Sequence, residues 1–248
     1  MRCPGQDSRY WRPGAIFEAK CPKCGKEVEF FKDEATRVCK GCGHRFLNPG
    51  LDFGCASYCQ YAEQCIGNLP PELISQKENL LKDRVAIEVK KYFGRDFKRI
   101  GHAMRVARYA EEIGREENGN LAVIIPAAYL HDIGIRDAEV VDPERVSNIH
   151  GEMGEPVARE ILSRLKAREE LIEEICAIIK DHHRPPPDNG KDFACVYDAD
   201  ILVNLEEGQK ENPAPADELK EKIEKLLLTP GGRKTASKAL GVESQGEG

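Results

Sequence analysis

The chain has 248 residues and a formal net charge of −6, which suits one large domain or a domain with a smaller module. This acidic balance disfavours a broad phosphate-binding surface, so we do not expect nucleic acid as a partner. No run approaches the roughly 18 apolar residues of a membrane helix. The polar first residues lack the apolar segment of a secretory signal, so we expect a cytoplasmic protein without a membrane span.

Eight of the ten cysteines lie in the first 65 residues, and clustered thiols in a cytoplasmic chain indicate metal ligands rather than disulfides. Cys21 and Cys24 form one CxxC pair, and Cys39 and Cys42 form another, with 14 residues between the pairs. A glycine follows each pair and permits a tight turn. Apolar and charged residues alternate over 27–30, as in a short strand. Residues 36–38 would form the returning strand that pairs with it. The arrangement resembles a zinc ribbon, in which four thiolates hold a structural Zn²⁺ that supplies much of the folding free energy.

A second group of cysteines, Cys3, Cys55, Cys59 and Cys65, is expected to form another metal site. Their spacing is looser than that of the CxxC pairs, and four thiolates suit either a second Zn²⁺ or a [4Fe–4S] cluster. Redox-active thiols without a metal are the alternative. We therefore expect a Cys-rich module over residues 1–70.

Helical periodicity begins after the double proline at positions 70 and 71. Apolar residues recur at spacings of three and four through residues 72–205, which predicts a mainly α domain. Pro126 lies in the apolar run 121–134 and predicts a distorted first turn or a late start for its helix. Residues 206–248 are expected to form a linker, one short helix and a flexible tail.

Metal-ligand residue types fall at the ends or on the inner faces of these predicted helices. They are His102, His131, Asp132, His150, His182 and Asp200, with His183 next to the last histidine. Each has a structural explanation by itself, because a buried histidine is more often a hydrogen-bonded core residue and a histidine–aspartate pair can end a helix. A buried aspartate is nevertheless costly without a cation or a partner. Together these positions indicate a metal site, and the mixture of imidazole and carboxylate suits Zn²⁺, Mn²⁺, Fe or Co.

Five stretches of the helical segment carry a resemblance to a known family. They are His102-Ala-Met-Arg-Val-Ala, residues 127–134 (AAYLHDIG), His150-Gly-Glu-Met-Gly, Asp181-His-His183 and residues 198–205 (DADILVNL). In this order they resemble the HD superfamily of metal-dependent phosphohydrolases, over about residues 75–205 and again in the late segment Leu228-Thr-Pro-Gly-Gly-Arg-Lys234. The resemblance implies an HD-type helical bundle beside the small N-terminal β module.

The resemblance also implies two metal ions that share one carboxylate. The residues implied for the first ion are His102, His131, Asp132 and Asp200. The residues implied for the second ion, as in binuclear members, are His150 and His182, with His183 added by likeness to the tandem histidines of HD-GYP proteins. Asp132 would bridge the ions. The Gly-Tyr-Pro signature of those cyclic-dinucleotide phosphodiesterases is absent from this sequence, as is the acidic pair that follows the dyad in (p)ppGpp hydrolases.

The implied chemistry is phosphoryl hydrolysis, in which metal ions polarise a phosphoryl oxygen and lower the pKa of an attacking water. We expect Asp132, Arg105, Lys180 and Asn204 to take part in catalysis, with the basic side chains neutralising phosphate charge. Arg136 and Arg184 are further candidates, although any one of these cations can equally be a solvated surface charge. Asn204 resembles a residue in the corresponding helix of (p)ppGpp hydrolases.

We therefore expect a metal-dependent phosphohydrolase, either a phosphomonoesterase or a phosphodiesterase, that acts on a nucleotide or another phosphorylated small molecule. The Cys-rich module would serve for structure, for sensing or for docking a protein partner. Two alternatives stand beside this reading. The first alternative is a di-iron oxygenase, because HD relatives with six ligands of this kind, such as myo-inositol oxygenase, activate O₂. A non-enzymatic metal or ligand sensor, or an adaptor that docks through the Cys-rich module, is the other.

Overall fold

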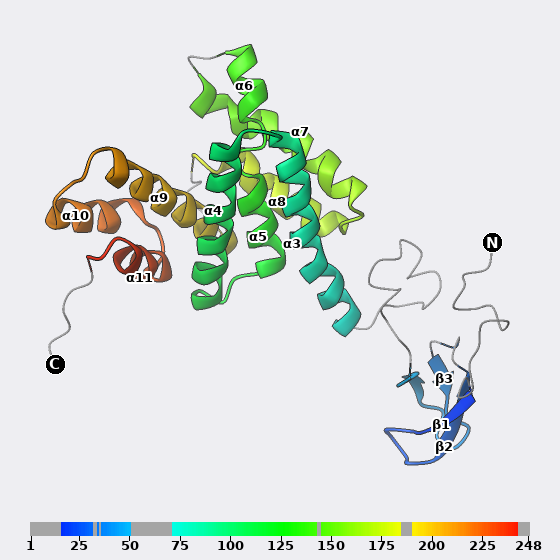
Figure 1. The fold of residues 1–248 in the computed structure, drawn as a ribbon. Helices are drawn as coiled ribbons and strands as arrows, with labels where there is room; N and C mark the ends of the chain where they lie inside the picture. Colours follow the sequence, from blue (N-terminus) through cyan, green and yellow to red (C-terminus); the bar gives the residue numbers. More distant parts are fainter. Residues whose placement is uncertain are drawn as a thin grey trace, which may run out of the picture. The chain divides into compact units, whose positions relative to one another are not determined.

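The computed structural model describes residues 16–31, 34, 36–50, 71–142, 145–184 and 190–242, apart from the side chains of 47, 71–79, 147 and 148. Contacts divide the chain into two compact units, Met1–Lys77 and Glu78–Gly248. The strands lie in the first unit and the helical bundle in the second (Figure 1). This confirms the predicted fold class, which is mainly α with a small N-terminal β module.

The β module consists of two antiparallel hairpins (Figure 1). β1 (Ile16–Lys20) pairs with β2 (Glu27–Phe31), and β3 (Thr36–Val38) pairs with β4 (Arg45–Leu47). The predicted strands at 27–30 and 36–38 both form, but the prediction that they pair with each other was wrong. Each strand instead pairs across the CxxC turn next to it, because that turn is tight enough to reverse the chain locally.

The module has a small core. Phe30 is fully buried, and its ring lies against the rings of Phe17 and Phe46. Cys21 and Cys39 belong to the same buried cluster, so thiols occupy positions that apolar side chains take in a larger domain. A cluster of this size contributes little folding free energy by itself.

The helical unit is an all-α bundle whose helices follow one another through short connections. Their bounds are α3 (Pro71–Phe93), α4 (Phe97–Glu116), α5 (Leu121–Leu130), α6 (Ile135–Val141), α7 (Val146–Arg164), α8 (Glu169–Asp181), α9 (Lys191–Glu211), α10 (Ala216–Leu226) and α11 (Pro230–Ala239). α4 packs against α5 and α9, α7 packs against α8, and α5 contacts both α8 and α9. One apolar core runs through these helices. In the ranges described, the bundle contains no helix long and apolar enough to cross a membrane.

Two helices near the site begin earlier than the sequence indicated. α5 starts at Leu121, where the Asn120 side chain accepts a hydrogen bond from the backbone N–H of Ala122 at 3.2 Å. Pro126 therefore lies inside the helix, and the expected late start was wrong. The sequence also indicated a helix that begins at His150, but α7 starts at Val146, so that His150 lies one turn inside it.

The sequence predicted a linker, one short helix and a tail after residue 205. The structure instead extends α9 to Glu211 and adds a second helix, α11, after α10. Thr229 caps α11, since its hydroxyl accepts a hydrogen bond from the Gly232 N–H at 2.9 Å. Asp198 of α9 is fully buried and accepts hydrogen bonds from the N–H groups of Leu228 and Thr229 at 2.7 and 2.8 Å. The same carboxylate accepts from the Thr229 hydroxyl at 2.6 Å, so the start of α11 is fixed to α9.

Candidate metal centre

The histidine–aspartate dyad at the end of α5 lies inside the helical unit. His131 is completely buried, and its Nδ1 lies 2.8 Å from the carbonyl oxygen of Ala128. A neutral imidazole that donates from Nδ1 presents a lone pair at Nε2. Within the part of the chain that the structure describes, this buried Nε2 has no hydrogen-bond partner. Oδ2 of Asp132 and Oδ1 of Asp200 face it at 3.4 and 3.6 Å without forming a hydrogen bond, and a metal ion is a partner that would satisfy all three atoms.

His131 belongs to a first group of donors, with His102 from α4 and Asp200 from α9. Oδ1 of Asp200 lies 3.1 Å from Nε2 of His102 and 3.6 Å from Nε2 of His131. Atoms this close can share one cation. Asn204, one turn further along α9, donates from Nδ2 to the same Oδ1 at 3.1 Å and holds the carboxylate in place.

A second group of donors combines Asp132 with histidines from α7 and from the end of α8. Nε2 of His150 lies 3.1 Å from Nε2 of His182, 3.0 Å from Nε2 of His183 and 3.0 Å from Oδ1 of Asp132. The Nδ1 atoms of His150 and His182 lie 2.8 and 2.6 Å from carbonyl oxygens of the preceding turn. Both rings are therefore held with Nε2 directed into the group.

Asp132 lies between the two groups and presents one oxygen to each. Its Oδ2 is 3.4 Å from Nε2 of His131 and 3.9 Å from Nε2 of His102. Its Oδ1 is 3.0 Å from Nε2 of His150 and 3.7 Å from Nε2 of His182. This is the placement that a carboxylate needs to bridge two cations.

The imidazoles and carboxylates of the centre shift one another's pKa values. Burial opposes the charged form of His131, but the carboxylates of Asp132 and Asp200 outweigh it and hold the pKa of the imidazole well above its usual value. Burial likewise favours the neutral acid at Asp132 and Asp200, yet the facing histidines prevail and the pKa of each carboxyl is lowered. Desolvation and the neighbouring imidazoles lower the pKa of His183 to about 4, which leaves it neutral at pH 7.

Glycines allow the backbones around the second group to approach closely. A Cβ on Gly134 would lie 2.3 Å from the amide nitrogen of Gly154 and 2.3 Å from the carbonyl oxygen of His150. A Cβ on Gly151 would lie 2.5 Å from the carbonyl oxygen of Lys180. α7 therefore sits directly on the turn that follows the dyad and on the last turn of α8, which is how His150 reaches both Asp132 and the α8 histidines.

The family model of the HD domain matches residues 99–219. We refer to the helical unit as the HD domain, after the family model that this part of it matches. A structure described as a predicted HD superfamily hydrolase, from an uncultured Thermotogales bacterium, is 24% identical to this chain, covers 63% of it and 83% of its own length, and has a TM-score of 0.47. No curated protein matches the chain.

The HD domain brings together all the histidines and aspartates predicted as its metal ligands, whereas the predicted catalytic side chains lie in different surroundings. Asn204 contacts Asp200, as above. Arg105 forms an ion pair with Glu207. Glu207 was missed by the sequence reasoning, although it follows Asp200 by seven residues and so lies on the same face of α9.

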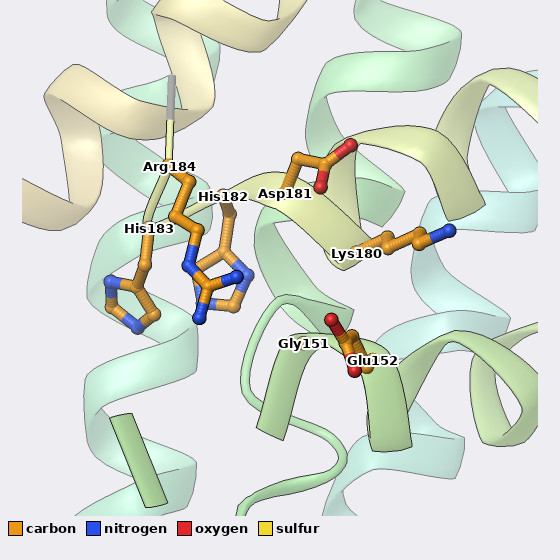
Figure 2. A pocket seen from close by; sticks show the side chains of 7 residues that line it. All are labelled: Gly151, Glu152, Lys180, Asp181, His182, His183 and Arg184. Atoms are coloured by element: carbon orange, nitrogen blue, oxygen red, sulfur yellow. The ribbon is translucent and has the colours of Figure 1, made fainter. Parts of the chain in front are cut away.

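A shallow pocket lies on the HD domain beside the second group. Its lining comes from the ends of α7 and α8, namely Gly151, Glu152, Lys180, Asp181, His182, His183 and Arg184. Figure 2 shows the Arg184 side chain extending alongside His182, whereas the Lys180 side chain extends away from both histidines. Arg184 is thus better placed than Lys180 to meet a ligand of the donor groups.

In the β module, the four cysteine sulfurs also converge. Sγ of Cys21 lies 3.7 Å from Sγ of Cys42, and Sγ of Cys24 lies 3.6 Å from Sγ of Cys39, with all four within 4.8 Å of one another. Zn–S bonds of about 2.3 Å in a tetrahedron place sulfurs roughly 3.8 Å apart, so these separations suit a tetrahedral ion. The two turns share a hydrogen-bond pattern in which the first cysteine N–H bonds to the carbonyl five residues on.

The second predicted thiol site, Cys3, Cys55, Cys59 and Cys65, lies outside the described residues.

Proposed function

We propose that this chain is a metal-dependent phosphohydrolase whose HD domain holds two divalent ions and acts on a nucleotide or another phosphorylated small molecule. The observation that carries the proposal is the position of Asp132, with one carboxylate oxygen toward each group of histidines. The match to the HD domain family supports hydrolysis as the reaction class.

His102, His131 and Asp200 would hold one ion, and His150, His182 and His183 the other, with Asp132 shared. Metal–nitrogen bonds of about 2.1 Å separate neighbouring ligands of an octahedral ion by roughly 3.0 Å, and the Nε2 separations of 3.0 and 3.1 Å around His150 agree with this value. Imidazole-rich sites with carboxylates suit Mn²⁺, Fe²⁺, Co²⁺ or Zn²⁺.

When bound, such ions supply Lewis acidity to a phosphoryl oxygen and lower the pKa of a water. The protein's own groups position the donors. Backbone carbonyls hold His131, His150 and His182 with Nε2 inward, and Asn204 holds Asp200. Arg184, at the rim of the second group, would attract the negative charge of a phosphate.

We further propose that the β module holds a structural Zn²⁺ through Cys21, Cys24, Cys39 and Cys42. Such an ion would supply folding free energy that the small core around Phe30 does not. Ile16 and Val38 expose apolar side chains on this module, to 54% and 42%, and are the candidate contacts for a protein partner.

The test uses the full chain, depleted of the His/Asp-bound metal by mild chelation and reloaded without oxygen with Mn²⁺, Co²⁺ or Fe²⁺. Phosphate or nucleoside monophosphate release is then measured on nucleotides, dinucleotides and sugar phosphates. We expect hydrolysis by the reloaded protein and none by the Asp132→Asn variant, which keeps the shape but loses the shared charge. O₂ consumption by the iron form without phosphate release would favour a di-iron oxygenase, and full metal occupancy with neither activity would favour a sensor.

A further inference from the structure

The partner of Nδ1 separates His102 from three other histidines of the donor groups. His131, His150 and His182 each direct Nδ1 to a backbone carbonyl of the preceding turn. Nδ1 of His102 instead lies 3.4 Å from Oε1 of Glu207, a side chain of α9. The helix that supplies Asp200 to one side of this imidazole therefore supplies a carboxylate to its other side as well.

Arg105 holds Glu207 in this position. It follows His102 by three residues on α4, so the two side chains lie on the same face of that helix. Its Nη2 is in contact with the Glu207 Oε1 that faces His102. The Glu207 side chain is only 27% exposed. Its geometry is thus set from two sides, by an imidazole and a guanidinium of the same helix.

The neighbouring Glu206 has a different role. Its Oε1 accepts a hydrogen bond from the hydroxyl of Tyr109, two turns from His102 on α4. Both carboxylates therefore join α9 to α4, but the described contacts of Glu206 do not include a residue of the donor groups. This makes Glu206 a matched control for any effect of the α4–α9 contact alone.

We propose that Glu207 is a positioning residue for the metal ligand His102, and that Arg105 acts through Glu207 rather than on substrate. By accepting a hydrogen bond from Nδ1–H, Glu207 would select the tautomer with its lone pair at Nε2, which faces Asp200. A carboxylate behind a ligating histidine also raises the basicity of that ligand. The proposal rests on the proposed binuclear function and adds that its two metal subsites differ in affinity.

The difference in metal affinity follows from the charges around each group of donors. The first group has Asp200 as its own carboxylate and Glu207 behind His102, whereas the second has three imidazoles and only the shared Asp132. The first subsite therefore binds its ion more tightly, and Glu207 contributes to that difference.

Mn²⁺ titration of the full chain, followed by the electron paramagnetic resonance signal of free Mn²⁺, tests this. The β module is kept in its zinc-loaded form, because Mn²⁺ does not compete for thiolates. We expect two sites of unequal affinity in the unaltered chain. The isosteric Glu207→Gln change should weaken the tighter site by about 10–100-fold and leave the weaker site unchanged, and Arg105→Ala should weaken the same site. Glu206→Gln should leave both sites unchanged.

Equal loss in Glu206→Gln and Glu207→Gln would overturn the proposal, since it would show that only helix packing matters. Unchanged Mn²⁺ affinities in Glu207→Gln would overturn the role of Glu207 but would not contradict the binuclear metal centre. Failure of the unaltered chain to bind Mn²⁺ at the His/Asp groups would overturn the binuclear centre and the role of Glu207 together. Thermal unfolding of each variant shows whether it is folded during the titration.

Discussion

Replacing Gly134 with alanine should remove the second metal ion while leaving the first. Gly134 has an ordinary backbone conformation, with φ −86° and ψ −2°, so alanine adds no conformational strain. The added Cβ would lie 2.3 Å from two backbone atoms of α7, where ordinary contacts begin at 3.4 Å. Backbone cannot rotate away, so α7 must move by about 1 Å, and overpacking of this kind costs about 1–3 kcal/mol.

The displacement acts directly on the second group of donors. It would carry Nε2 of His150 from 3.0 Å to about 4 Å from Oδ1 of Asp132, whereas metal sites tolerate errors of about 0.2 Å in ligand distance. His102, His131 and Asp200 do not belong to α7 and should still hold their ion. At roughly 2–4 °C per kcal/mol for a domain of this size, the unfolding midpoint should fall by about 2–12 °C.

The assay is elemental analysis of the purified variant together with thermal unfolding followed by circular dichroism. Gly208→Ala is the control for a glycine with room around it, because Gly208 lies inside α9 and a Cβ there meets no atom within 4 Å. That change should keep both ions and stabilise the protein by about 0.5–1 kcal/mol. A Gly134→Ala protein with the full metal content and an unchanged midpoint would refute the role assigned to this close approach.

Three further predictions concern the metals themselves. His131→Ala and Asp132→Ala should each abolish metal binding in the HD domain and leave the thiolate-bound metal in place, as elemental analysis would show. Cys24→Ser should have the opposite effect, releasing zinc from the β module while the His/Asp-bound metal stays. Metal affinity of the HD domain should rise with pH, because the raised pKa of His131 keeps this imidazole protonated in the metal-free protein and the ion must displace that proton. Calorimetric titration in two buffers of different ionisation enthalpy would count the protons released.

Each of these predictions can fail in a distinct way. The ligand assignment is wrong if both dyad variants retain the metal of the HD domain. The zinc assignment is wrong if the cysteine variant keeps its zinc and its hairpins. For the pH dependence, the sign is fixed by linkage. A raised histidine pKa stabilises the metal-free fold below pH about 6.5 and ceases to do so as pH rises through the raised value. Metal binding without proton release would contradict the predicted rise of metal affinity with pH.

Helical periodicity was sufficient to predict which histidines and aspartates would converge. Each of them lies at the end or on the buried face of a helix, and the helices of a single domain turn their buried faces toward one core. His182 ends the stripe of α8, and Asp200 lies on the buried face of α9, as expected. Strand pairing in the β module was not predictable from alternation alone, since residues 27–31 carry the same pattern whichever neighbour they join. The start of α11 had a local signal, a threonine cap followed by proline.

The remaining features depend on tertiary distance, which the sequence does not display. The glycines at 134, 151 and 154 are unremarkable in a single sequence, and only the packing of α7 shows that a methyl group would not fit there. The pairing of Arg105 with Glu207 joins residues 102 positions apart. The role of Arg105 in phosphate binding stays a prediction, and its ion pair with Glu207 could not be seen before the two helices were placed side by side.

The hydrogen bonds of Asp198 determine where this domain ends. The stretch matched by the HD family model stops at residue 219, inside α10 and before Leu228 and Thr229. A protein excised at that limit would lose every described donor to the Asp198 carboxylate, two residues from Asp200 on the same helix. The smallest autonomous form of the metal-binding domain should therefore extend past the end of the family match and include α11 (Pro230–Ala239).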